Sequence, residues 1–305
     1  MLLLSYLWNV SERMIEVLAN DSLSIGFFLG LGADEKAPDH STLTLFKNRL
    51  VNNAGLKTYE ELFDEMIKIA QEKGVKFGKL QVVDSVHLVA DVNVGKDKQR
   101  QSRGKTPRDG DARWGAKGNK IAVGKDGKRH KETQYYYGYK EQVSLNAESG
   151  LVTSVIPGRA DDYDGHKFKK LVDKDLSKGI EIGTVTADKG YDDGENHYYL
   201  EKHGINSAIR LNSYRTQKKD ENKAGWVELK ESFEYQKGLK ERYKVERKFG
   251  EAKKWHGFAR CRYIGFVRHA IQSYLTFMAL NLKRLVKLLT SVSFKGEVKA
   301  YSMSG

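Results

Sequence analysis

The sequence has a single cysteine and no long apolar run, and each absence excludes a class of protein. Cys261 is the only cysteine in 305 residues, so neither a disulfide framework nor a cysteine-based zinc site is possible. Residues 1–8 are apolar but lack the basic segment and small-residue cleavage site of a signal peptide. Polar residues at 11–13 interrupt this run well before the roughly twenty apolar residues of a membrane span. We therefore expect a cytoplasmic protein.

The charge is strongly basic and unevenly distributed. Fifty-three Lys and Arg face forty Asp and Glu, which gives a net charge of +13. Residues 96–131 hold thirteen basic and four acidic residues, and residues 240–268 hold ten and three. Local concentration of this kind favours a polyanion such as nucleic acid or an anionic membrane surface. An inert basic surface is the alternative.

Helix-like and strand-like patterns alternate along the chain, which indicates a mixed α/β protein. Helices at 2–19, 41–53 and 58–73 would form a DNA-binding unit or merely a helical cap. A period-two pattern begins at Leu80, whereas residues 96–134 are polar, Gly-rich and basic, as in a loop. The predicted division is a helical region at 1–76, a core at 77–292 with a basic insertion at about 95–134, and a tail at 293–305.

Three carboxylates stand where chemistry is plausible. Asp84 lies on the apolar face of its strand, where a carboxylate is costly unless it is paired or bound to a cation. Asp188 follows a predicted strand and precedes a glycine turn, the position at which α/β sheets bind ligands. Glu246 shares a stripe with Arg242 and Lys253 on a helix predicted at about 238–255, and the apolar residues beside that stripe predict that Glu246 turns toward the protein body. Simpler explanations remain open: an internal bond for the first, helix capping for the second, and a surface ion pair for the third.

Oxygen ligands from two strands and a helix suit Mg²⁺, with Mn²⁺ as a substitute, better than zinc. Two such ions about 4 Å apart can activate an attacking oxygen and stabilise the leaving oxygen in phosphodiester displacement. The basic side chains near the carboxylates would contact DNA phosphates. The candidate phosphate contacts are Arg242, Lys253, Arg247, Lys140 and Lys189.

Several stretches resemble bacterial insertion-sequence DDE transposases of the IS-five type. Arg242-x3-Glu246-x6-Lys253 is similar to the pattern Tyr-x2-Arg-x3-Glu-x6-Lys of a wider group of these enzymes. Leu239 stands where that pattern has tyrosine. The resemblance covers nearly the whole chain. The other matching stretches are residues 38–42, 82–85, 109–115, 138–140, 187–192 and 245–250.

The resemblance implies an α/β fold with an RNase H-like catalytic core, a mixed β-sheet flanked by helices, preceded by a small helical region. It implies that Asp84 on the first strand, Asp188 after the fourth and Glu246 on a late helix are catalytic and bind two metal ions. The implied partner is double-stranded DNA, both at terminal inverted repeats and at a target. The implied reaction is strand cleavage by water, followed by attack of the freed 3′-hydroxyl on target DNA. A homodimer on DNA, association with the nucleoid when bound, and no membrane partner are expected.

Members of that family usually carry additional residues before the part that matches residues 1–7, so we expect a clipped N-terminus. This expectation keeps two alternatives open. One is a transposase-derived DNA-binding protein without catalytic activity. The other is an RNase H-like, structure-selective nuclease. The intact set of three carboxylates favours the transposase.

Overall fold

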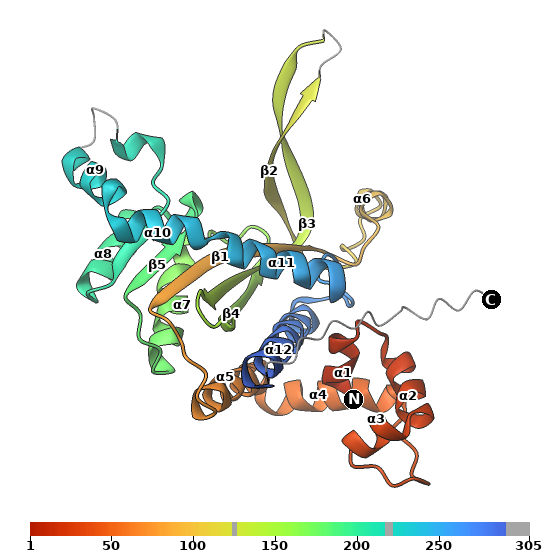
Figure 1. The fold of residues 1–305 in the computed structure, drawn as a ribbon. Helices are drawn as coiled ribbons and strands as arrows, with labels where there is room; N and C mark the ends of the chain where they lie inside the picture. The colour runs from red at the N-terminus through yellow and green to blue at the C-terminus, as the bar shows by residue number, and fades with distance from the viewer. Residues whose placement is uncertain (124–126, 217–221, 291–305) are drawn as a thin grey trace.

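The computed structural model describes residues 1–123, 127–216 and 222–290, in which helices surround one mixed sheet (Figure 1). The α-helices are α1 Leu2–Leu7, α2 Glu12–Asp21, α3 Leu23–Phe28, α4 His40–Ala54, α5 Lys57–Glu72, α6 Val94–Ser102, α7 Gly165–Ser177, α8 Gly194–Lys202, α9 Lys223–Glu231, α10 Phe233–Glu241, α11 Tyr243–Trp255 and α12 Phe266–Thr290. The strands are β1 Leu80–Val89, β2 Arg113–Val123, β3 Arg129–Asn146, β4 Val152–Arg159, β5 Thr184–Ala187 and β6 Asn206–Ile209.

The sheet has the core strand order β4-β3-β1-β5-β6. Strand β3 runs antiparallel to β1 and β4, whereas β5 is parallel to β1 and β6 is parallel to β5. Helices α7 and α8 make the crossovers that parallel strands require. This order and these directions are those of an RNase H-like core, so the predicted fold class is confirmed.

The register of β1 against β5 places two of the predicted carboxylates side by side. The parallel ladder ends where Val83 lies opposite Ala187. The residue after Val83 is Asp84, and the residue after Ala187 is Asp188. Neighbouring strands lie about 4.8 Å apart, so the backbones of these residues are close. Beyond this point β1 continues without β5 beside it.

The N-terminal helices share the main hydrophobic core with the sheet. Tyr6 of α1 and Phe63 of α5 belong to the same buried cluster as Tyr274 of α12. The rings of Phe63 and Tyr274 lie 6.2 Å apart. A second, smaller cluster joins α1, α2 and α4 through Leu4, Ile15 and Leu43. The division at residue 76 stays a prediction, and the predicted tail at 293–305 lies outside the described residues.

Helix α12 is the longest helix, and most of its residues from His269 to Asn281 are buried. It packs against α1, α5 and β4. Buried polar side chains interrupt its apolar surface, and Asn281, for example, bonds both backbone groups of Val152. Among the described residues, no helix combines the length and the apolarity that a membrane span needs.

Two local predictions are wrong. Residues 2–19 form two helices, because Ser11 caps α2 by accepting a hydrogen bond from Met14 N and Asn9 has a φ of +54°. Most of the described part of 96–134, predicted as a loop, forms α6, β2 and the first third of β3. The paired strands satisfy each other's backbone beyond the core sheet, so neither face needs the apolar alternation that marks a half-buried strand.

One close approach in the sheet is testable. A Cβ on Gly138 would overlap the carbonyl oxygen of Leu88 and lie 2.9 Å from the nitrogen of Ala90. Gly138→Ala should lower the free energy of unfolding by about 3 kcal/mol or more, because backbone cannot yield as a flexible side chain does. Gly250→Ala, in open space within α11, should instead raise it by up to about 1 kcal/mol. Urea unfolding measures both; equal effects would contradict the assigned packing.

Candidate active site

Asp84 is largely buried, with 15% of its side chain exposed. Its Oδ2 accepts a hydrogen bond from Arg242 Nη2 at 3.2 Å, and its Oδ1 accepts one from Ser85 N at 2.8 Å. Burial raises the pKa of Asp84 to about 6, although Arg242 and the Ser85 amide act in the opposite direction. The charges of Asp188 and Glu246 add to the increase.

Asp188 and Glu246 are near enough to Asp84 for their charges to add to its raised pKa. Asp188 directly follows β5, and its Oδ1 accepts a hydrogen bond from Gly190 N at 2.8 Å. Asp188 therefore caps the 3-10 helix Lys189–Tyr191, as the simpler explanation predicted. It also follows the strand residue that pairs with Val83, the neighbour of Asp84. Glu246 lies in the first turn of α11, which packs against β1 (Figure 1).

Glu246 is exposed, so the expectation that its helix turns it toward the protein body is wrong. Within residues 245–250, the buried side chains are those of Val245 and Phe249. Glu246 consequently lies at the margin of α11. Three carboxylates fit a hard divalent cation, which prefers oxygen ligands. The charges of Asp188 and Glu246 repel that of Asp84 and add to its raised pKa, and a bound cation would offset this repulsion.

In the described part of the chain, the residues whose ligand atoms lie within 4.8 Å of one another are a different set, Glu16, Asp39 and His40. These residues hold the start of α4. Asp39 accepts a hydrogen bond from Ser41 N at 2.6 Å, and His40 Nδ1 lies 2.7 Å from a Glu16 oxygen. The matching stretch at 38–42 thus joins α2 to α4.

Arg242 separates two helices where the sequence predicted one helix at 238–255. It forms the C-cap of α10 and the N-cap of α11. Its guanidinium pairs with Asp84, and no Arg242–Glu246 ion pair occurs among the described residues. Arg242 Nε is buried without a hydrogen-bond partner there. The side chain therefore orients Asp84, and its predicted contact with phosphate stays a prediction.

The other four predicted phosphate contacts differ in how freely they can reach DNA. Lys189 and Arg247 are exposed, and Lys253 is half-buried. Burial, and then the charge of Lys117, lower the pKa of Lys253. Lys140 pairs with Asp164 at 2.7 Å and donates to the carbonyl of Asp162 at 2.5 Å. The phosphate role of all four stays a prediction.

Asp164 is a fourth carboxylate near this site, and the sequence did not identify it. Its Oδ1 accepts a hydrogen bond from Gln142 Nε2 at 2.6 Å. A Cβ placed on Gly190 would lie 3.5 Å from Asp164 Oδ2 and 2.9 Å from Asp188 Oδ1, so the two carboxylates flank one point. Asp164 stands at the N-cap of α7 without capping it. An aspartate before a helix normally predicts a helix cap, so nothing in the sequence distinguished Asp164 from an ordinary capping residue.

Two motif aspartates are structural. Asp109 is fully buried and accepts hydrogen bonds from Tyr139 OH at 2.8 Å and from Gly265 N at 3.3 Å, just before α12. Asp192 binds the side chains of His197 at 3.0 Å and Arg215 at 3.2 Å. The stretches 109–115 and 187–192 therefore fix the loops around the carboxylates.

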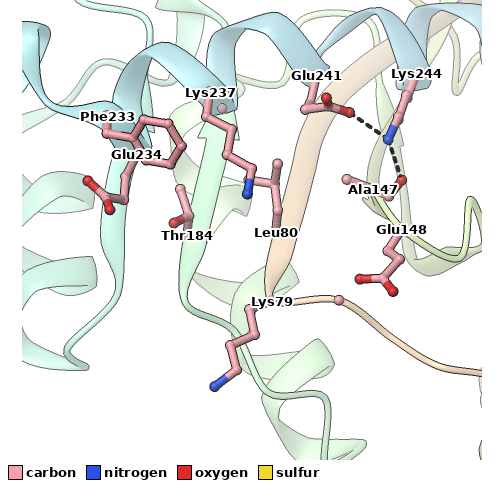
Figure 2. A pocket seen from close by; sticks show the side chains of 12 residues that line it. Lys79, Leu80, Ala147, Glu148, Thr184, Phe233, Glu234, Lys237, Glu241 and Lys244 are labelled. Carbon is pink, nitrogen blue, oxygen red and sulfur yellow. Dashed lines mark hydrogen bonds and ion pairs between the residues drawn. The ribbon is translucent and has the colours of Figure 1, made fainter.

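A hollow lies at the other end of β1, between the start of the strand and α10 (Figure 2). Lys244 donates to the carbonyl of Ala147 at 2.8 Å and pairs with Glu241 at 2.5 Å along its rim. None of the three predicted carboxylates is among its lining residues. The hollow is thus separate from the candidate active site.

The raised pKa of Asp84 gives a signed prediction for stability without divalent metal. The folded protein holds this proton more tightly than an unfolded chain does, so wild-type stability falls as the pH rises from about 4 to about 6. Asp84→Asn removes this loss. The variant's free energy of unfolding, relative to wild type, should therefore increase by up to about 3 kcal/mol between about pH 4 and pH 7. Urea unfolding at both pH values is the measurement, and a pH-independent difference would contradict the assignment.

Comparisons with known proteins identify the family of this chain. Residues 92–282 match the family "Transposase DDE domain", and residues 1–49 match "Transposase domain (DUF772)". Over 245 residues the chain is 29% identical to the transposase for insertion sequence element IS1106 of Neisseria meningitidis serogroup B, covering 77% of this chain and 75% of that protein.

Two solved structures show weak likeness. The Mos1 mariner paired end complex with Mn has a TM-score of 0.25 at 12% identity, covering 76% of this chain and 61% of that chain. The Mos1 transposase paired-end complex with left transposon end has a TM-score of 0.23 at 10% identity, covering 92% and 78%. At these scores the fold assignment rests on the strand order. Because the DDE match spans more than half of the sequence, the chain belongs to the transposase DDE domain family, as an insertion-sequence transposase that acts on DNA.

Proposed function

We propose that Asp84, Asp188 and Glu246 are the catalytic residues of DNA transposition and hold two Mg²⁺ ions, for which Mn²⁺ can substitute. The carrying observation is that Asp84 and Asp188 directly follow the last paired residues of the β1–β5 ladder. Burial is the main cause of the raised pKa of Asp84, and the charges of Asp188 and Glu246 add to it. Three carboxylates from β1, the end of β5 and α11 therefore share one electrostatic environment. The register of β1 and β5 supports the pairing of the two aspartates.

Each residue has a distinct part in the proposed reaction. The bound ions supply activation of the attacking oxygen and stabilisation of the leaving one. Asp84 and Asp188 act from the edge of a rigid sheet, and Glu246 completes the set from α11. Arg242 orients Asp84. Lys253, Arg247, Lys189 and Lys140 are the proposed contacts with DNA phosphates.

The reaction is cleavage at the element's ends, followed by joining of the freed 3′-hydroxyl to target DNA. The proposed partner is double-stranded DNA at terminal inverted repeats and at the target, bound by a homodimer. Membership of the IS-five type is part of the same proposal. So are a helical DNA-binding region at 1–76, a catalytic region at 77–292, and a cytoplasmic, nucleoid-associated location.

The site assignment is tested by nicking of duplexes that carry the element's ends, in the presence of Mg²⁺. Glu246→Gln should reduce nicking at least about a hundredfold, because a neutral amide binds a divalent cation much more weakly than a carboxylate does. Glu251→Gln is the matched control on the same helix, since Glu251 pairs with Lys248 and Lys283 instead. It should retain nicking. Undiminished nicking by Glu246→Gln would overturn the assignment, and binding without nicking by wild type would indicate a non-catalytic descendant.

Metal binding itself is measurable without activity. Mg²⁺ or Mn²⁺ at a hundred times its dissociation constant should stabilise the folded protein by about 2.7 kcal/mol, raising its melting temperature. Asp188→Asn should lose most of this increase, because one ligand becomes neutral. The same increase in the variant would show that the ions bind elsewhere.

A further inference from the structure

A two-stranded ribbon projects from the sheet (Figure 1). It carries none of the three candidate carboxylates. We define the arm as residues 116–123 of β2 and 129–135 of β3. These segments pair with each other in antiparallel register, and their residues are exposed apart from the half-buried Ala122. An isolated two-stranded ribbon is marginally stable in water, so a surface partner would hold it in place.

The two faces of the arm differ in chemistry. Ile121 lies opposite Lys131, and Val123 lies opposite Arg129, so these four side chains share one face. Ile121 is 70% exposed and Val123 is 66% exposed. In the described residues no ion pair holds Arg129 or Lys131.

The opposite face carries Lys120 and Glu132 across from each other, and they form an ion pair at 3.1 Å. That face therefore neutralises its own charge. The first face, which we call the arm face, has two cations beside two branched apolar side chains. Its charge is available to an external anion.

The base of the arm lies near α11. The register shifts between Ala116 and Gly118, so Lys117 is the extra residue of a β-bulge, and Gly118 has a φ of +104°. Bulges re-aim side chains, and the positive φ favours glycine. Lys117 and Lys253 of α11 both lower the pKa of His87 on β1, to about 4, after the larger effect of burial. The bulge thus brings a cation of the arm close to α11, on which Glu246 lies.

We propose that the arm lies in a groove of the DNA duplex that leaves the carboxylate site. Arg129 and Lys131 contact backbone phosphates there, and Ile121 and Val123 contact base edges. A two-stranded ribbon fits the major groove, where thymine methyl groups offer apolar contacts. Lys117 continues the same basic surface back to α11. This inference rests on the proposed action on DNA and adds a binding surface to it.

Charge favours DNA over a second copy of this chain as the occupant. Residues 116–123 and 129–135 contain four Lys or Arg and one Glu, in a protein whose net charge is +13. Two such arms, or an arm against another basic surface, would repel each other. A duplex supplies the complementary charge along the length of the ribbon.

The test is binding of the full chain to a short duplex of mixed sequence without divalent metal, so that no cutting occurs. Arg129→Gln with Lys131→Gln should weaken binding about tenfold or more at low salt, and should reduce the slope of log K against log salt by about 2. The matched control removes two lysines of α5, Lys57→Gln with Lys68→Gln, whose side chains pair with glutamates along their own helix. It should leave the slope unchanged.

A second variant tests the apolar contacts. Ile121→Thr with Val123→Thr keeps the β-branched shape that strands favour, so the ribbon is preserved. It should weaken binding with an unchanged salt slope, because no charge is lost. Wild-type affinity and slope in both arm variants would overturn the inference, as would a loss of dimers by sedimentation with DNA binding intact. Wild type that binds DNA through the arm but never nicks it would defeat the proposed catalysis alone.

Discussion

The ion pair between Asp84 and Arg242 ties the middle of the sheet to the joint between α10 and α11. Both partners are largely buried, and breaking such a pair leaves an uncompensated charge that typically costs about 3–5 kcal/mol. The pair therefore holds the start of α11 against β1. Because Glu246 lies one turn further along, its position depends on the same contact. The pair thus relates Glu246 to Asp84, whereas the register of β1 and β5 relates Asp188 to Asp84.

The pair compensates the burial of Asp84 only in part. Its pKa remains raised because burial outweighs Arg242 and because two further carboxylates add their charges. Carboxylates that repel one another in this way destabilise the folded state, and a bound cation would offset that repulsion. Asp109 and Asp192 have the opposite character, since each is satisfied by hydrogen bonds from the loops around it. Aspartates of this chain thus differ in role according to the groups around them: Asp109 and Asp192 hold loops in place, whereas Asp84 keeps a raised pKa.

The parts of the fold with one buried face could be predicted from the sequence. The alternation around Asp84 predicted its strand, because burial imposes a period of two, and the glycine turn predicted the strand end at Asp188. That the two aspartates share one site was implied only by the family resemblance. The arm could not be predicted, since a ribbon exposed on both faces needs no apolar alternation. The break at Arg242 and the place of Asp164 depend on contacts with β1 and β3, residues far away in the sequence. Local patterns carry no trace of such contacts.

The shared core of α1, α5 and α12 has a consequence for how this protein can evolve. Tyr6 and Phe63 are fully enclosed by the part of the chain that carries the carboxylates. Recombination that exchanged the N-terminal helices for those of a distant relative would leave an unfilled interior, at about 3–5 kcal/mol for each lost aromatic side chain. New DNA specificities are therefore acquired more easily by point changes on exposed surfaces than by swapping modules.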